Sequence, residues 1–217
     1  MIIQENSNNL DWSRMEGLNR LGRILKRKFS GEEVGSLAVL LSLASEKGRV
    51  SYEEIEGERE TKENLLLLVY NVRLLLPVRT SQVSKTLAWE DRLLITKPGE
   101  MYEMPNVIRY LIRHAEESGE WKPDYAVKRY LENIEEPETE KILKLFQEVK
   151  KRVADSKILS RTNKVTPELL KESSEKLGLE LDMDKTIAEL KGGGIISPCL
   201  RNFSRCGIRY EINPSLL

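Results

Sequence analysis

The chain has 217 residues and carries 35 basic and 35 acidic side chains, so its formal net charge is zero. Charged residues make up 32% and aromatic residues only 6%, which is typical of a soluble, mainly helical protein. No run of about 18 apolar residues occurs, and the first residues lack the pattern of a signal peptide. We therefore expect a cytoplasmic protein with no membrane contact, divided into two domains of about 100 residues.

The zero net charge hides a difference between the two parts of the chain. Residues 1–140 contain 20 basic and 25 acidic side chains, whereas residues 141–217 contain 15 and 10. The C-terminal part is therefore the better candidate for binding a polyanion.

Residues 1–30 are predicted to form an amphipathic docking helix. Its basic residues lie mostly opposite a row of apolar residues at helical spacing: Trp12, Met15, Leu18, Leu21, Leu25 and Phe29. Such a helix can bind a membrane surface or nucleic acid, but its commoner role is to cover its own protein's core. We expect this helix to cover the protein's own core.

Residues 31–120 are predicted to form the first domain. Capping and breaking residues indicate helices over 31–47, 52–60, 61–76 and 106–118, and extended runs over 87–95 and 100–104 on either side of a turn at Pro98 and Gly99. The helix over 61–76 is apolar around nearly its whole circumference, so we expect it to be buried on all sides. This favours an interaction or dimerisation domain. Residues 121–137 are predicted to form a linker and a helix.

Residues 138–217 are predicted to form the second domain. An apolar stripe begins at Ile142, and a second helix begins at Thr166 and Pro167 and ends near Gly178. A third helix, capped by Asp182 or Asp184, ends at the glycines 192–194. Strands over 195–200 and 207–212 then flank a polar tip.

This order of helix, turn, helix and hairpin resembles the winged-helix family of helix-turn-helix domains. The first half resembles it more loosely, without a residue-level repeat. The predicted fold is thus mainly α with small β-hairpins (α+β), with two winged-helix-like domains joined by helices. In that family the second helix of the pair enters the major groove and the hairpin touches the flanking DNA. The resemblance implies a reading helix at 182–191 and a wing, with these DNA-contacting residues: Lys185, Thr186, Lys191, Arg201, Asn202, Arg205 and Arg209.

The acidic residues of the reading helix, Asp182, Asp184 and Glu189, would repel phosphates. Arginines suit phosphate contact because the guanidinium is always charged and donates in a fixed fork. We therefore expect the arginines of the wing to carry most of the DNA contact.

The residues expected of an enzyme are lacking. His114 is the single histidine, and no Ser or Cys nucleophile constellation, metal-ligand spacing or phosphate-binding glycine loop accompanies it. We predict no catalytic residue, no metal and no cofactor. Cys199 and Cys206 would face each other across the wing, where they could form a disulfide or a redox sensor, or pack as reduced side chains.

The sequence thus predicts a DNA-binding regulatory protein, similar to transcription regulators, that acts as a dimer and binds double-stranded DNA through its C-terminal domain. The alternative is a non-enzymatic protein-protein scaffold of tandem winged helices, an architecture similar to that of chromosome-organisation accessory subunits.

Overall fold

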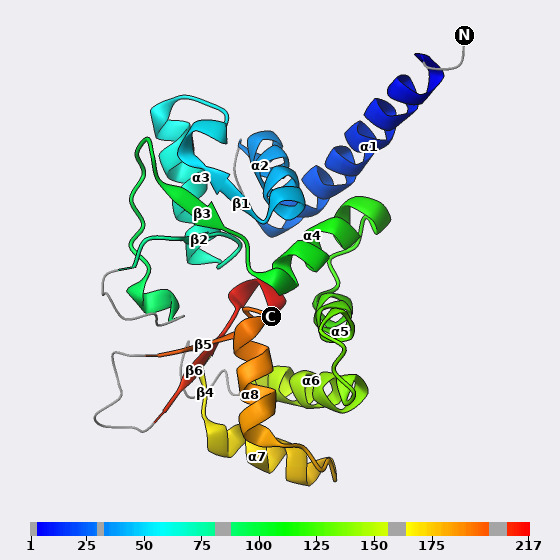
Figure 1. Cartoon of the computed structure of the whole chain (residues 1–217), viewed down its shortest axis with the longest axis vertical. Coiled ribbons are helices and arrows are strands. Elements are labelled where there is room, and N and C mark those ends of the chain that lie inside the picture. Colours follow the sequence, from blue (N-terminus) through cyan, green and yellow to red (C-terminus); the bar gives the residue numbers. More distant parts are fainter. Residues whose placement is uncertain (1–3, 30–32, 81–87, 156–163, 200–207) are drawn as a thin grey trace.

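The computed structural model describes residues 4–29, 33–80, 88–155, 164–199 and 208–217. These residues form a mainly helical protein with two small antiparallel sheets, which confirms the predicted class (Figure 1). None of the helices in the described ranges combines the length and the apolar character needed to cross a membrane.

Helix α1 (Gln4–Lys28) packs on α2 (Val34–Lys47) and α4 (Asn106–Ser118). Leu21 and Leu25, two of its predicted inner residues, are fully buried. The prediction was wrong for Trp12 and Met15, which are 71% and 50% exposed. They lie in residues 12–16 of α1, all of which are exposed, and burial begins at Gly17; Figure 1 shows that the N-terminal part of α1 projects past α2 and α4.

The first half of the chain contains a three-stranded sheet among its helices. After α2 come β1 (Arg49–Ser51), the 3-10 turn η1 (Tyr52–Glu54), α3 (Arg59–Asn71), β2 (Leu76–Pro77), η2 (Trp89–Asp91) and β3 (Met101–Glu103). The strand order is β1-β3-β2, and both pairs are antiparallel.

Four predictions for this half need correction. Residues 52–60 form only the η1 turn and the start of α3, and η2 interrupts the extended run over 87–95. Helix α3 ends at Asn71, because Arg73 adopts φ +58° and the amides of Leu74 and Leu75 donate to the Val69 carbonyl. This turn buries both leucines. Leu67 is 51% exposed, so α3 is not buried on all sides.

The second half follows the predicted order. It comprises α6 (Thr139–Asp155), β4 (Lys164–Val165), α7 (Pro167–Lys176), α8 (Met183–Gly192), β5 (Ile196–Pro198) and β6 (Tyr210–Ile212). Thr166 Oγ1 accepts a hydrogen bond from the Leu169 amide, and Asp182 Oδ1 accepts one from the Lys185 amide. Asp182, rather than Asp184, is therefore the cap of α8. Strands β5 and β6 are shorter than predicted.

The two halves repeat one arrangement. Each begins with a helix and continues with a strand, a helical turn or helix, a helix and two strands. In each sheet the last strand lies in the middle, giving the orders β1-β3-β2 and β4-β6-β5. Figure 1 shows the first unit above the second.

Residues 121–137 do more than link the two units. Helix α5 (Pro123–Asn133) packs against α4 and α6, and its Ala126, Val127 and Leu131 are fully buried. The buried apolar side chains of both halves form one continuous cluster.

Hydrogen bonds at the end of the chain fasten the halves together. The buried Asn213 donates from Nδ2 to the carbonyl oxygens of Arg73 (3.1 Å) and Gly194 (3.3 Å). Ser215, in the 3-10 turn η4 (Pro214–Leu216), donates from Oγ to the Val72 carbonyl at 2.6 Å. The left-handed turn after α3 therefore presents its carbonyl oxygens to the second half.

Candidate nucleic-acid interface

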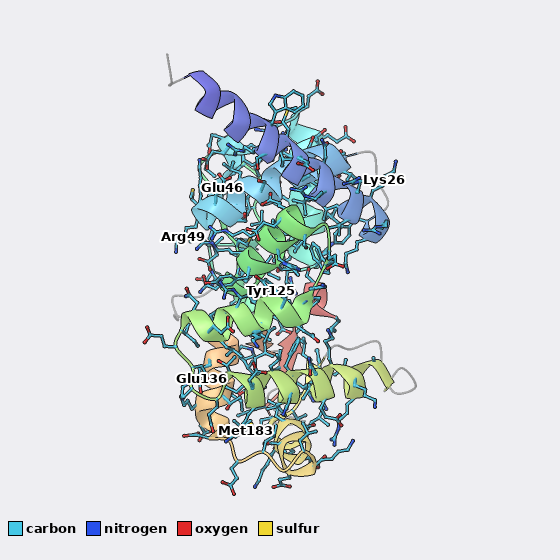
Figure 2. The ribbon with its side chains drawn as sticks, turned by 90° about the vertical axis from the view of Figure 1, so that its right-hand side faces the viewer. Lys26, Glu46, Arg49, Tyr125, Glu136 and Met183 are labelled. Carbon is cyan, nitrogen blue, oxygen red and sulfur yellow. The ribbon has the colours of Figure 1, made fainter. Side chains whose placement is uncertain are left out.

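The predicted reading helix, α8, does not present an open basic surface. Lys185 Nζ lies 2.7 Å from Glu136 Oε2 and 3.6 Å from Glu189 Oε1. Glu136 belongs to the turn between α5 and α6 (Figure 2), and its side chain is only 2% exposed. Lys185 thus neutralises a buried carboxylate of its own protein, which leaves little of its charge for a phosphate.

The two carboxyl groups beside Lys185 differ strongly in acidity. Burial, followed by the neighbouring Glu136, raises the pKa of Glu189 to about 7. Burial opposes ionisation of Glu136 too, but its interactions with Glu189, Lys185 and the Glu138 amide outweigh this and lower its pKa to about 2. Near neutral pH the group therefore contains an ionised Glu136 and a partly protonated Glu189.

The other predicted DNA contacts do not gather on one face of the described residues. Thr186 is 2% exposed and points into the core. Lys191 lines a small pocket of about 160 Å³ between the halves, together with Arg92 and Glu103. Arg209 is partly buried, and its Nε has no hydrogen-bond partner within the described residues. Arg201, Asn202 and Arg205 lie outside the described residues.

Helix α3 occupies the position in the first half that α8 occupies in the second. Its exposed residues are Glu60, Asn64, Leu67, Asn71 and Arg59, of which Arg59 is paired with Glu63. This surface is polar and partly apolar and carries little positive charge, so it offers no counterpart to a basic reading helix.

Cys199 is a buried, free cysteine, 3% exposed. Burial raises the pKa of its thiol, which favours the unreactive protonated form. Cys206 lies outside the described residues, so the structure does not test the pairing of the two.

His114 stacks on Tyr125 of α5, with ring centroids 4.0 Å apart. Its Nε2 is buried and has no hydrogen-bond partner in the described part of the chain. The same residues contain no group of three or more His, Cys, Asp or Glu side chains that could hold a metal ion.

A basic groove lies between α1 and the C-terminal end of α4. It has a volume of about 590 Å³ and is lined by Arg20, Arg23, Lys26 and Arg27 of α1 and by Ser118 and Gly119 at the end of α4. The helical pattern placed these basic residues on the outer side of an amphipathic helix, whose expected role was to cover the protein's own core. The available signal was local: residues 17–28 contain five basic side chains and no acidic one.

A protein-family model matches residues 19–217, which is most of the chain. The chain belongs to this family. The description of the family states no activity, ligand or fold. Neither the curated proteins nor the solved structures yield a match. The family match spans both repeated halves and the basic part of α1, whereas Trp12 and Met15 precede it.

Proposed function

We propose that the protein is a cytoplasmic DNA-binding regulator built from two winged-helix modules. The observation that supports this most is the repeated arrangement, in which each half places its last strand in the middle of a three-stranded sheet behind a run of helices. This order of elements and strands is the one expected of a winged helix, a fold whose commonest role is to bind DNA.

Within this proposal, the second half contacts DNA through its wing rather than through α8. Lys185 is engaged by Glu136, and Thr186 is buried, so α8 has few groups left to read bases. The wing carries Arg201, Asn202 and Arg205, and Arg209 follows it. Guanidinium groups there would position the protein on phosphates or in the minor groove.

Duplex binding as a function of salt tests this function. We expect a fluorescently labelled duplex to bind the full chain at about 50 mM salt and to dissociate steeply towards about 200 mM, as counterion release requires. The double variant Arg201→Ala, Arg205→Ala should lower the affinity and flatten the salt dependence. The matched control is Arg59→Ala, Lys97→Ala, which removes two exposed basic residues elsewhere. Absence of duplex binding by the full chain at low salt would refute the function.

The second candidate function is a non-enzymatic scaffold that binds proteins through the same modules, including a second copy of itself. The outer faces of α3 and α8 favour it, because they combine acidic and amide side chains with the exposed Leu67. Sedimentation of the purified chain tests it: a dimer dissociated by Leu67→Asp, in a protein without duplex binding, would favour the scaffold.

A further inference from the structure

We infer that the basic groove between α1 and the end of α4 binds the phosphate backbone of a nucleic-acid duplex. This inference rests on the proposed DNA-binding function and assigns it a surface that the winged-helix resemblance does not include. The groove-lining residues of α1 are Arg20, Arg23, Lys26 and Arg27.

Three of these cations are free to bind a ligand. Arg23, Lys26 and Arg27 are exposed, and none of them forms an ion pair with an acidic side chain in the described part of the chain. More than half of the other basic side chains in the described ranges have an acidic partner, whereas these three neighbouring cations of α1 have none.

The fourth cation holds the groove in shape. Arg20 Nε donates to the carbonyl oxygen of Glu116 at 2.6 Å, and its Nη1 lies 2.8 Å from Glu16 Oε1. Its aliphatic part lies against Gly119, where a Cβ atom would be 3.6 Å from Arg20 Cδ. Because Gly119 adopts φ +74° to end α4, the wall of the groove depends on a glycine.

The positive potential continues beyond the groove. Lys28 Nζ lies 5.0 Å from the centre of the Trp121 ring, and desolvation followed by the charge of Lys150 lowers its pKa. Lys150 of α6 is itself paired with Asp124 at 2.9 Å, so Lys28 is the cation that extends the row beyond the groove. Figure 2 shows Lys26 at the end of α1, on the side of the molecule formed by α1, α4, α5 and α6.

The packing of α1 favours a nucleic acid over a lipid surface. The apolar residues of this segment, Leu21, Ile24 and Leu25, are at most 3% exposed and are used by the protein's own core. A helix that binds in a membrane interface needs that face for insertion. Between Arg20 and Arg27 only the charged face remains, and it spans roughly 10 Å at about 1.5 Å per residue. Several cations along such a length suit a regular row of phosphates.

The test compares two triple variants with equal loss of charge. The groove variant, with Arg23→Gln, Lys26→Gln and Arg27→Gln, replaces the three unpaired cations by glutamine, which is a good helix former. The control variant, with Arg59→Gln, Lys97→Gln and Lys171→Gln, removes three exposed cations from α3, a turn and α7. Duplex affinity and its salt slope are measured for four proteins. These are the two triple variants, the wing variant with Arg201→Ala and Arg205→Ala, and the unchanged chain. Circular dichroism establishes that each variant is folded.

We expect the groove variant to bind a duplex of any sequence at least tenfold more weakly. Its salt slope should fall by about two to three, at about 0.9 per phosphate contact, while the control variant keeps its affinity. Equal weakening of both triple variants would overturn the inference, because net charge alone would then explain binding. An unchanged groove variant beside a weakened wing variant would overturn it and leave the proposed function standing.

Two further outcomes complete the test. If the unchanged chain binds no duplex, the function and the inference fail together. If it binds vesicles containing an anionic phospholipid but no duplex, the groove serves a lipid surface, and the inference is overturned.

Discussion

Lys185 Nζ lies 2.7 Å from the buried Oε2 of Glu136, in a helix that sequence analysis expected to read DNA. The pair joins α8 to the turn between α5 and α6. Removing one partner of a buried pair leaves the other charge uncompensated. The lysine therefore contributes to the packing of the second half, and Glu189 is explained by its position beside this pair.

The carboxyl groups beside Lys185 predict a specific dependence of stability on pH. Folding raises the pKa of Glu189 from the ordinary 4.5 to about 7, so the folded protein holds a proton there that the unfolded chain has lost. This contribution to stability is complete below about pH 4.5 and disappears as the pH rises to about 7. Glu136 acts in the opposite sense: its lowered pKa stabilises the fold above pH 4.5, and that contribution is lost as the pH falls towards 2.

We therefore expect Glu189→Gln, which imitates the protonated carboxyl, to flatten the loss of stability between pH 5 and 7. At neutral pH the variant should gain about 1–3 kcal/mol relative to the unchanged chain, since one pKa unit corresponds to about 1.4 kcal/mol. Urea unfolding at a series of pH values measures this. Glu117→Gln, an exposed glutamate of α4, is the control and should leave the pH profile unchanged. Identical profiles for Glu189→Gln and the unchanged chain would contradict the expectation.

Asn213 provides the second prediction, because its buried side chain joins the two halves. Asn213→Ala leaves the carbonyl oxygens of Arg73 and Gly194 and the Ser215 amide without a partner. We expect a loss of about 2–3 kcal/mol, since a buried polar group left unsatisfied costs about 1–3 kcal/mol. The exposed Asn71 is the control, and Asn71→Ala should cost less than about 0.5 kcal/mol.

The continuous core predicts that Asn213→Ala still unfolds in one step. Tryptophan fluorescence and far-UV circular dichroism should report the same midpoint for both the variant and the unchanged chain. Two separated transitions would mean that the halves are stable independently and that the junction is weaker than its hydrogen bonds indicate.

Local signals in the sequence predicted the second half well, because they act over a few residues. Thr166, Pro167, Gly178 and the glycines after α8 mark their helix ends correctly. The end of α3 was missed because Arg73 adopts φ +58°, and a non-glycine residue gives no such signal in the sequence. That turn is held by contacts from Asn213 and Ser215, which are 140 residues or more away along the chain.

The candidate sites were harder to predict than the helices. Periodicity identified α1 as amphipathic but could not tell where its neighbours stop, so Trp12 and Met15 were placed in the core. It also could not tell that Lys185 has a buried acidic partner or that Arg23, Lys26 and Arg27 have none among the described residues. These differences depend on tertiary contacts, which a helical pattern does not contain.

Gly194 provides the third prediction, because it allows the halves to approach closely. It adopts φ +72°, and a Cβ atom there would lie 2.5 Å from Pro105 Cβ. Gly194→Ala should destabilise the protein by about 2–4 kcal/mol, combining the cost of a left-handed alanine with overpacking. Gly178→Ala is the matched control, since Gly178 has φ +64° but open space around it. It should cost only about 1–2 kcal/mol. If Gly194→Ala and Gly178→Ala lowered the stability equally in thermal unfolding, Pro105 would have to shift without cost to make room for the new Cβ atom.

The fourth prediction tests the two parts of α1 against each other. Leu21 is fully buried, so Leu21→Ala should cost about 2–5 kcal/mol by removing apolar contacts and leaving a cavity. Trp12 is the larger side chain but is 71% exposed. Trp12→Ala should therefore change the free energy of unfolding by less than about 0.5 kcal/mol. Urea unfolding at two protein concentrations distinguishes the explanations: a large cost for Trp12→Ala that grows with concentration would mean that a second copy covers this end of α1.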